Sequence, residues 1–436
     1  MDEDNKVNQC PTQKAYAVVI LDFASRLQER VVLRKSLVRG CVESISRTKT
    51  LSEPPAVYRR GNLETNPPQP SRNPYLCGAM HQRTDIRSIT TEELILFFEQ
   101  HGEKKFRAKQ VMEWLWKKSA QRFDQMTNLS VGTRELLQEH FSFSTIRVAD
   151  QQISSDRTIK CAFEVEAGKV VEGVLIPTTS RMTACISSQV GCSLSCAFCA
   201  TGRLKMLRNL TAGEIVDQVV YLRNQAQEHY QLPLSNIVYM GMGEPLLNYK
   251  NVMTSIEKIT SPDGLGMSPQ RITVSTAGVA KMIQKLGDDG AKFNLALSLH
   301  AANDEKRNRI MDINESNHLE TLANALKYFH EKTGTRVTFE YIIFKDFNDS
   351  IRDAHELANY CKNLPVKINI IEYNPIDDGE YQQAAPERVD AFATFLESRN
   401  LIVNVRRSRG KDIDAACGQL ANKNAALLKD QVVRKR

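Results

Sequence analysis

The string Gly191-Cys-Ser-Leu-Ser-Cys-Ala-Phe-Cys199 places three cysteines, Cys192, Cys196 and Cys199, at spacings of four and three residues. Three thiolates on one short loop can bind one face of a metal cluster, and no fourth cysteine follows at a matching spacing nearby. For zinc this set leaves the tetrahedral coordination incomplete. For a four-iron, four-sulfur cluster it leaves one iron free to bind another ligand. The string therefore predicts a cluster-binding loop, with a zinc site or unligated cysteines as the alternative.

From residue 181 onward, apolar runs alternate with amphipathic stretches of helical length. This alternation predicts repeated βαβ units and a parallel sheet. Six such units are too few for a closed eight-stranded barrel. We therefore expect an α/β fold with a partial (β/α)6, TIM-like barrel over residues 181–405. The expected strands are 183–187, 236–240, 271–275, 293–299, 337–343 and 367–373, with a last strand at 401–405.

The chain outside the barrel divides into four segments. Residues 1–82 are rich in Ser, Pro and Asn near their end, and we expect a flexible or poorly ordered basic extension. Residues 83–145 predict a small N-terminal helical domain, and residues 146–180 alternate between apolar and polar side chains, as short β-strands do. Residues 406–436 form a C-terminal tail. The expected helices of the small domain begin at Thr90, which starts a capping box with Glu93, and cover about 107–118 and 131–140.

Composition limits the class of protein. A chain of 436 residues with 25% charged and 42% apolar residues is typical of globular proteins with two or three domains. No apolar run is long enough to span a membrane, and ten cysteines are too dilute for a disulfide scaffold, so we expect a reducing, cytoplasmic location. The net charge of +7 is a weak indication of a nucleic-acid partner, because residues 1–79 alone carry 12 basic and 8 acidic residues.

Polar residues follow several of the expected barrel strands, where parallel α/β folds collect their active sites. One strand runs into the glycine-rich turn Gly241-Met-Gly-Glu-Pro245, in which Glu244 can accept a hydrogen bond from a cation. The others run into Ser275, into Ser298-Leu-His300 and into Asn374. These strand ends lie at the same edge of the predicted sheet as the end of the strand that runs into the cysteine loop. We therefore expect one site that joins them.

The C-x3-C-x2-C string resembles that of the radical S-adenosylmethionine (SAM) enzymes. The resemblance implies one 4Fe-4S cluster with Cys192, Cys196 and Cys199 as ligands and SAM on the open iron. It also implies that Gly243 and Glu244 bind the amino group of SAM. The residues implied for its carboxylate and ribose are Ser275, Ser298, Leu299, His300 and Asn374. His300 has a second interpretation, as a buried and hydrogen-bonded histidine.

Three longer strings narrow the resemblance. The first is Cys185-Ile-Ser-Ser-Gln-Val-Gly-Cys192 with the cysteine loop after it, the second is Gly241-Met-Gly-Glu-Pro245, and the third is Arg409-Gly-Lys-Asp-Ile-Asp-Ala-Ala-Cys417-Gly-Gln-Leu420. Together they resemble the RlmN type of radical SAM methyltransferase over about residues 84–425. That type methylates C2 of an adenosine in large-subunit (23S) ribosomal RNA and in certain transfer RNAs. A lone cysteine is otherwise most often a small buried apolar residue.

The resemblance implies a role for each extra residue. C2 of adenine is electron-poor and does not attack the methyl group of SAM, so a radical route is required. Cys417 would take a methyl group from a first SAM as a thiolate, and a second SAM would supply the radical that activates it. A covalent protein–RNA adduct follows. Glu172 would remove the C2 proton, and Cys185 would attack the Cys417 sulfur, which releases the methylated RNA and leaves a disulfide.

Two alternatives remain open. A Cfr-like enzyme methylates C8 of the same base and shares the cluster, Cys185 and Cys417 positions, although the sequence contexts here resemble the C2 type more closely. A non-catalytic zinc protein that binds RNA is the other alternative.

The resemblance also implies ribosomal RNA and transfer RNA as partners and an electron donor such as a flavodoxin or a ferredoxin. We expect a monomer with no membrane partner. Basic residues that could contact phosphates are Lys205, Arg208, Arg406, Arg407, Arg409 and Lys411.

Overall fold

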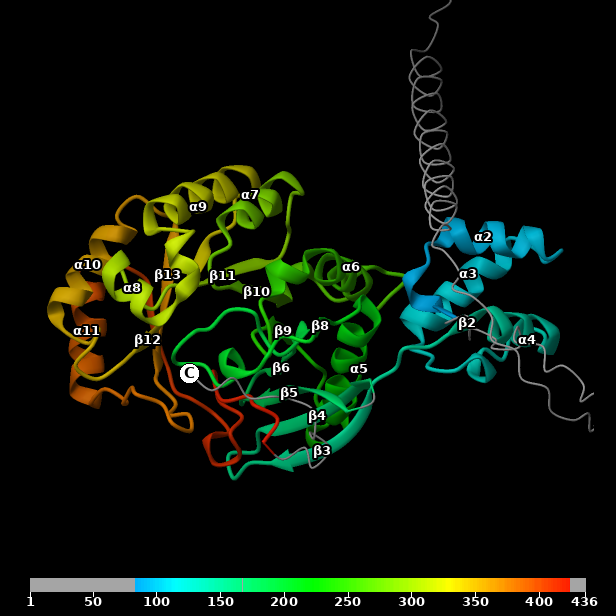
Figure 1. Ribbon diagram of the computed structural model, residues 1–436, viewed down its shortest axis with the longest axis horizontal. Helices are drawn as coiled ribbons and strands as arrows, with labels where there is room; N and C mark the ends of the chain where they lie inside the picture. Colours follow the sequence, from blue (N-terminus) through cyan, green and yellow to red (C-terminus); the bar gives the residue numbers. More distant parts are fainter. Residues whose placement is uncertain (1–82, 167, 424–436) are drawn as a thin grey trace, which may run out of the picture. The chain divides into compact units, whose positions relative to one another are not determined.

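The computed structural model describes residues 83–166 and 168–423. The extension expected over residues 1–82 lies outside the described residues, as does the end of the tail. Ten strands form one sheet in the middle of the described chain (Figure 1). In spatial order they are β14 (Val403–Arg406), β13 (Val366–Glu372), β12 (Val337–Ile343), β11 (Asn294–Ser298), β10 (Ile272–Thr276), β9 (Asn236–Tyr239), β6 (Met182–Cys185), β5 (Lys169–Pro177), β4 (Ile159–Glu166) and β3 (Arg147–Ile153).

The seven strands β6, β9, β10, β11, β12, β13 and β14 are all parallel to one another. Each lies within about two residues of its predicted position, because buried parallel strands are short apolar runs that are easy to recognise. This mixed α/β architecture is consistent with the expected partial barrel. The helices between the strands are α5 (Ala212–Tyr230), α6 (Tyr249–Thr260), α7 (Ala280–Asp288), α8 (Asp304–Ile310), α9 (Leu319–Thr333), α10 (Ile351–Cys361) and α11 (Pro386–Ser398).

The sheet continues beyond the barrel without a break. β5 pairs antiparallel with β6, and Val174 lies opposite Cys185. β4 and β3 then extend the sheet by two more antiparallel strands. The strands expected over residues 146–180 therefore exist, and their pairing brings the strand of Glu172 beside the strand of Cys185.

The N-terminal helices follow the predicted pattern with one difference. α2 (Thr91–Gln100) begins with the predicted capping box, and α4 (Val131–His140) has the predicted bounds. The helix expected over 107–118 is α3 (Phe106–Met112) followed by a π-helical turn over Glu113–Lys117. A π-helix turns less per residue, so the sequence neighbours Leu115 and Trp116 can both be buried.

Arg87 connects this helical segment to α5 through a buried ion pair. Its Nη1 atom lies 2.7 Å from Oδ1 of Asp217, and the two side chains are 3% and 5% exposed. Arg87 also donates to the carbonyl oxygens of Gly213 and Ser144. We expect Arg87→Met to lower the free energy of unfolding by about 3–5 kcal/mol, because it leaves a buried carboxylate without its partner. Urea denaturation followed by circular dichroism measures the change.

Arg122→Met is the matched control for this measurement. Arg122 pairs with Asp124 at 3.0 Å, but the two side chains are 70% and 65% exposed. Losing an exposed pair changes the stability little, because water screens the two charges. Equal losses of stability in the two variants would contradict the importance of the buried pair.

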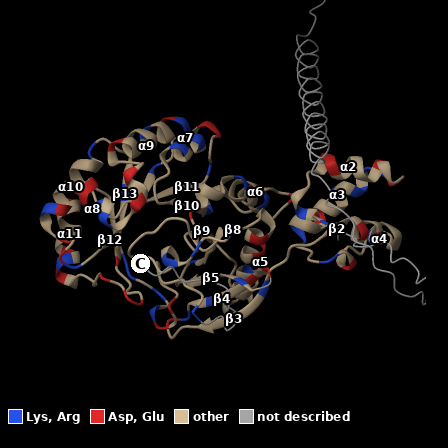
Figure 2. Cartoon of the chain, viewed as in Figure 1, with Lys and Arg blue, Asp and Glu red and all other residues tan. Residues whose placement is uncertain are grey.

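Charged side chains of both signs lie along the outer helices, such as α8, α10 and α11, while the central strands are mostly uncharged (Figure 2). Among the described residues, no helix has the length and apolar character needed to cross a bilayer. The main apolar core fills the space between the sheet and its helices and includes Val274, Leu295 and Phe339.

Candidate active site

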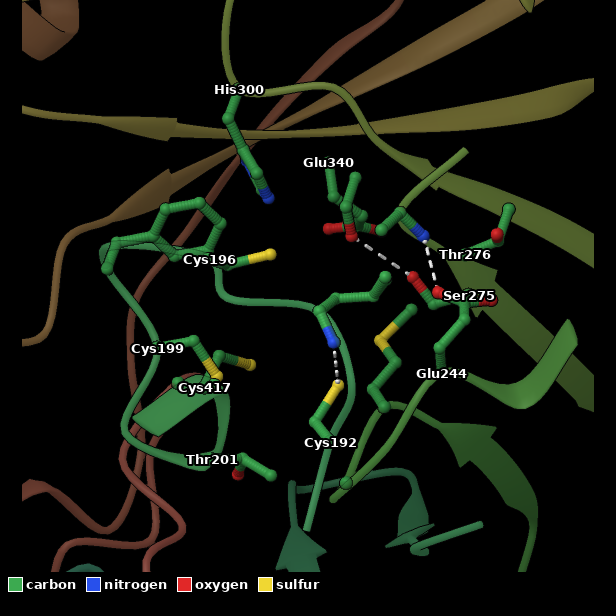
Figure 3. A pocket seen from close by; sticks show the side chains of 18 of the residues that line it. Cys192, Cys196, Cys199, Thr201, Glu244, Ser275, Thr276, His300, Glu340 and Cys417 are labelled. Atoms are coloured by element: carbon green, nitrogen blue, oxygen red, sulfur yellow. Dashed lines mark hydrogen bonds between the residues drawn. The ribbon is translucent and has the colours of Figure 1, made fainter. Parts of the chain in front are cut away.

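The three cysteines lie on a loop that a short ladder closes at its base. β7 (Gln189–Val190) pairs antiparallel with β8 (Arg208–Asn209) at the two ends of this loop. Gly191 has a φ of +76°, and a Cβ at this position would lie 2.2 Å from the carbonyl oxygen of Lys205, so only glycine fits. Figure 3 shows the thiols of Cys192, Cys196 and Cys199 around the same open space.

This space is a cavity of about 160 Å³ at the C-terminal ends of the parallel strands. The three thiols line it, as the sequence predicts. Five of the seven residues expected to bind SAM also line it, namely Gly243, Glu244, Ser275, Ser298 and His300. The structure therefore brings the strand ends and the cysteine loop together in one site.

Glu244 is held rigidly at the cavity wall. Its Oε1 accepts from the backbone N–H of Leu246 at 3.0 Å, and its Oε2 accepts from that of Ala277 at 2.8 Å. Burial raises the pKa of this carboxyl, and the two hydrogen bonds act in the opposite direction. Gly243 before it has a φ of +95°, and a Cβ there would lie 2.5 Å from the Cβ of Gln189. The turn thus presents a buried carboxylate that can accept from a cation.

His300 is buried and hydrogen-bonded, and it also lines the cavity. It is 3% exposed, and its Nδ1 accepts a hydrogen bond from the backbone N–H of Ile342 at 3.1 Å. Nδ1 is therefore unprotonated, and Nε2 carries the proton. Burial, together with the charge of Arg307, lowers the pKa of His300 to about 3. The ring is neutral and also lines the cavity beside the ring of Phe198, at a centroid distance of 4.7 Å.

Leu299 and Asn374 do not line this cavity. The side chain of Leu299 belongs to the main apolar core. Asn374 is 3% exposed, and its Nδ2 donates to the carbonyl oxygen of Cys417 at 3.1 Å. Its Oδ1 is buried and has no hydrogen-bond partner among the described residues. Asn374 therefore holds the tail and keeps one unused acceptor.

A second cavity of about 110 Å³ adjoins the first. Cys185 lines only this cavity, whereas Cys417 lines both. Cys417 is exposed and Cys185 is buried. The two extra cysteines, which are far apart in the sequence, thus meet at one cavity.

The tail around Cys417 is tied to the cysteine loop. The backbone N–H of Ala200 donates to the carbonyl oxygen of Gly418 at 2.7 Å, and Oγ1 of Thr201 donates to that of Leu420 at 2.6 Å. These bonds explain why Cys417 lies close to Cys199 in Figure 3.

Glu340 was not identified from the sequence, which predicted its partner Arg406 only as a possible phosphate contact. Glu340 lines the first cavity, and Arg406 lines both. The Nη1 atom of Arg406 lies 3.1 Å from Oε2 of Glu340, whose Oε1 accepts from Nδ2 of Asn369 at 2.8 Å. Desolvation in the cavity raises the pKa of the Cys417 thiol, and Arg406 acts in the opposite direction. The indication in the sequence was a single carboxylate, Glu340, within the apolar strand Val337–Ile343.

Glu172 lies outside both cavities and is 2% exposed. Its Oε1 lies 3.5 Å from Nζ of Lys160. Its Oε2 accepts from the backbone N–H groups of Ala421 and Asn422 at 2.9 and 3.0 Å. In this arrangement Glu172 anchors the end of the tail and does not reach the cavity next to Cys417.

Most of the basic residues named as phosphate contacts already have partners in the protein. Arg407 and Lys411 both pair with Glu372. Arg208 pairs with Glu166 and Glu214.

The donor set of the first cavity suits a cluster better than a single ion. No group of three or more His, Cys, Asp or Glu side chains within residues 83–166 and 168–423 is arranged to hold one metal ion. The three thiols instead surround a cavity, and the backbone N–H of Leu194 donates to Sγ of Cys192 at 3.4 Å.

Comparison with known proteins identifies the family. Residues 84–143 match the ribosomal RNA large subunit methyltransferase N-terminal domain, and residues 186–358 match the radical SAM superfamily. The chain is 57% identical over 351 residues to a probable dual-specificity RNA methyltransferase RlmN of Christiangramia forsetii, a match that covers 80% of this chain and 100% of the relative. The chain belongs to the RlmN family. A second RlmN relative, from Cytophaga hutchinsonii, is 56% identical over 80% of this chain and 97% of its own length.

A solved structure agrees with this RlmN assignment. The radical SAM methyltransferase of Sphaerobacter thermophilus matches with a TM-score of 0.73 and 37% identity, over 77% of this chain and 99% of the other. As a member of the RlmN family the chain is a SAM-dependent enzyme, and the family implies an iron–sulfur cluster. The non-catalytic alternative is therefore not retained.

Proposed function

We propose that the chain methylates C2 of an adenosine in large-subunit ribosomal RNA and of an adenosine in transfer RNAs. The observation that carries the proposal is the position of Cys417 on the wall shared by two cavities, one beside the cysteine loop and one beside Cys185. A methyl carrier between a radical source and a second thiol is what a radical methylation of an electron-poor carbon needs. The names of the relatives, which are RNA methyltransferases, support RNA as the substrate.

We propose that the first cavity holds a 4Fe-4S cluster and SAM. Cys192, Cys196 and Cys199 would bind three irons and leave the fourth for SAM. When bound, the cluster and SAM supply a carbon-centred radical that can take a hydrogen atom from a methyl group. Two SAM molecules per turnover would serve, one as the methyl source and one as the radical source. The residues proposed to hold SAM are Gly243, Glu244, Ser275, Ser298, Leu299, His300 and Asn374.

The proposed SAM contacts differ in kind. The buried Glu244 carboxylate suits the ammonium group of SAM, and the Nε2–H of His300 is a permanent donor because the ring stays neutral. The unused Oδ1 of Asn374 can accept from a ribose hydroxyl. Leu299 can contribute only van der Waals contacts of its backbone. Its side chain lies in the core, its N–H donates to the carbonyl oxygen of Glu340, and its carbonyl oxygen accepts from Ala301 and Arg307.

We propose that Cys417 carries the methyl group, that Glu172 removes the C2 proton and that Cys185 resolves the adduct. Glu172 can act as a base only if the tail first moves, because Ala421 and Asn422 occupy its Oε2. An RNA base must leave its stack to reach the Cys417 thiol. Its entry beside Cys417 would displace the tail. The Glu172 carboxylate would then be free to act as the general base only when RNA is bound.

We expect Glu172→Gln to slow formation of methylated RNA by about a hundredfold or more, the usual contribution of a general base. The protein–RNA adduct is expected to accumulate, because its proton is no longer removed. Denaturing gel electrophoresis of labelled RNA measures the adduct, and mass spectrometry of the tail peptide measures methylation of Cys417. Accumulated adduct, in which Cys417 is joined to the RNA through the former methyl carbon, supports the role as a base, as does methylation of Cys417 in the chains that carry no RNA.

The tail-anchoring role of Glu172 has a different signature. Loss of the anchor alone would reduce methylation of Cys417 and leave no adduct. Glu164→Gln is the matched control, because Glu164 lies on the neighbouring strand, pairs with Arg147 and lines neither cavity. Turnover of Glu172→Gln at the rate of this control would exclude the role as a base.

The proposed reaction is tested by identifying its product. Anaerobically purified, cluster-reconstituted protein is incubated with SAM, a reductant and protein-free large-subunit RNA or transfer RNA, and the digested RNA is analysed by mass spectrometry. 2-Methyladenosine is expected from both RNAs. 8-Methyladenosine would assign the chain to the Cfr-like type. Cleavage of SAM without any methylated base would reject the RNA substrate.

We further propose that the enzyme works as a cytoplasmic monomer and takes electrons from a flavodoxin or ferredoxin. One described chain supplies every residue of the proposed site, which supports the monomer. Analytical ultracentrifugation of the active preparation tests it.

A further inference from the structure

Arg307 on α8 is a fully buried arginine, and its hydrogen-bond partners carry no charge. Its Nη2 donates to the carbonyl oxygens of Ala277 at 2.6 Å and Ser298 at 3.2 Å. Its Nε donates to that of Leu299 at 3.1 Å, and its Nη1 donates to Oδ1 of Asn314 at 2.6 Å. All four acceptors are neutral amide or peptide oxygens.

The charge of Arg307 is not neutralised by an adjacent acid. No ion pair within 4.0 Å includes Arg307 among residues 83–166 and 168–423, and Asp304 reaches it only through Asn314, whose Nδ2 donates to Oδ1 of Asp304 at 2.8 Å. Burial lowers the pKa of Arg307 to about 10, so the guanidinium remains protonated at neutral pH. An unpaired buried charge is costly and is retained where a negative group or a function compensates for it.

The guanidinium lies behind the cysteine loop. The backbone N–H of Ala197 donates to the carbonyl oxygen of Ile310, at the end of the same helix, at 3.0 Å. Cys196 packs against the small apolar cluster that contains Ala277 and Ile310. Ala277, which accepts from Arg307, lines the first cavity together with Cys196. The positive charge is therefore next to the Cys196 side of the cavity.

Arg307 is fully buried. Low-dielectric surroundings strengthen the effect of its charge on the adjacent cavity because water does not screen it.

We propose that Arg307 is a positioning residue that raises the reduction potential of the cluster through its charge and fixes the ends of β10 and β11 through its hydrogen bonds. The inference rests on the proposed three-cysteine cluster and deepens it. Reduction adds one electron from an external low-potential donor to the cluster, and no bond is made or broken. The added negative charge is stabilised by the nearby guanidinium, which is why loss of Arg307 makes the cluster harder to reduce.

The second part of the role concerns SAM. Arg307 joins the carbonyl oxygens of Ala277 and Ser298, which follow β10 and end β11. Ser275 and Ser298 present their hydroxyl groups to the cavity from these strands, with the two Oγ atoms 3.4 Å apart. The forked guanidinium spans both strand ends, whereas a lysine ammonium would carry the charge without this geometry.

The test compares three variants of the reconstituted full chain, Arg307→Met, Arg307→Gln and Arg307→Lys, in a potentiometric titration followed by electron paramagnetic resonance. The reductant is dithionite, SAM is absent, and iron and sulfide per chain are measured. At the wild-type midpoint potential, we expect the ratio of reduced to oxidised cluster to fall about tenfold in the Met and Gln variants, which corresponds to a shift of about 59 mV for a one-electron couple. The Lys variant is expected to keep the wild-type midpoint and to bind SAM several-fold more weakly.

Arg309→Met is the matched control, because Arg309 lies on the same helix but is exposed, with its guanidinium 4.9 Å from the ring centroid of Phe347. This variant is expected to change neither the midpoint nor SAM binding. A full cluster with an unchanged midpoint in either neutral variant would overturn the inference. So would a midpoint that falls by about 59 mV in the Lys variant, and this result remains decisive if the neutral variants do not assemble a cluster. Absence of iron and sulfide from the wild type would instead reject the proposed ligand set.

Discussion

Cys417→Ala is expected to abolish RNA methylation, with a loss of about a thousandfold or more, because no other described side chain is placed to carry the methyl group. Cys417 is exposed at the wall that the two cavities share, and the other cysteine of that wall, Cys199, is a proposed cluster ligand. Removal of a covalent nucleophile leaves binding and orientation but not the reaction. Mass spectrometry of the digested RNA measures the loss.

Cys361→Ala is the control for this variant. Cys361 is buried on α10 and lines neither cavity. Its loss is expected to leave the rate of methylation unchanged. Iron, sulfide and SAM binding are expected to be normal in both variants, so a methylated base formed by Cys417→Ala would contradict the role of Cys417 as methyl carrier.

Cys185→Ala is expected to stop the enzyme within its first turnover, with the RNA covalently attached. Cys185 lines the second cavity with Cys417, so it is placed to attack the Cys417 sulfur and release the product. Without that attack, we expect the adduct to approach one RNA per active chain and release of product to fall by about a thousandfold or more. Denaturing gel electrophoresis followed by mass spectrometry of the cross-linked peptide measures the adduct.

The protonation state of Cys185 adds a pH dependence to this step. Burial, followed by the charge of Cys417, raises the pKa of the Cys185 thiol to about 12, and Arg406 acts in the opposite direction. Only the thiolate attacks, and its fraction increases as the pH rises towards the pKa. Release of product by the wild type is therefore expected to become faster with rising pH. Cys161→Ala, a buried cysteine outside both cavities, should turn over normally.

The sequence predicted the parts of the fold that depend on short-range patterns. The parallel strands β6 and β9 to β14 are apolar runs between amphipathic helices. The capping box at Thr90 lies within four residues. The cysteine loop could be predicted because its first and last cysteines, Cys192 and Cys199, are only seven positions apart. The π-helical turn at Glu113–Lys117 was not predicted, because it depends on how Leu115 and Trp116 pack.

The resemblance to a known family supplied the proposed roles of Cys185, Cys417 and Glu172, which no local pattern contains. It did not supply their surroundings. The pairing of Glu340 with Arg406 joins residues 66 positions apart. The proposed role of the buried Arg307 charge depends on the strand ends around it.

The sequence by itself therefore determined the order of strands and helices, the cysteine loop and the polar strand ends. Each of these depends on residues that are close together in the chain. Only the tertiary structure decided which of these groups meet. Pairing of β5 with β6 brings Glu172 and Cys185 to neighbouring strands, and hydrogen bonds from Ala200 and Thr201 hold the tail of Cys417 against the cysteine loop. The hydrogen bonds of the tail join segments more than 200 residues apart in the chain. These contacts depend on sheet order and on backbone hydrogen bonds, which periodicity and spacing do not encode.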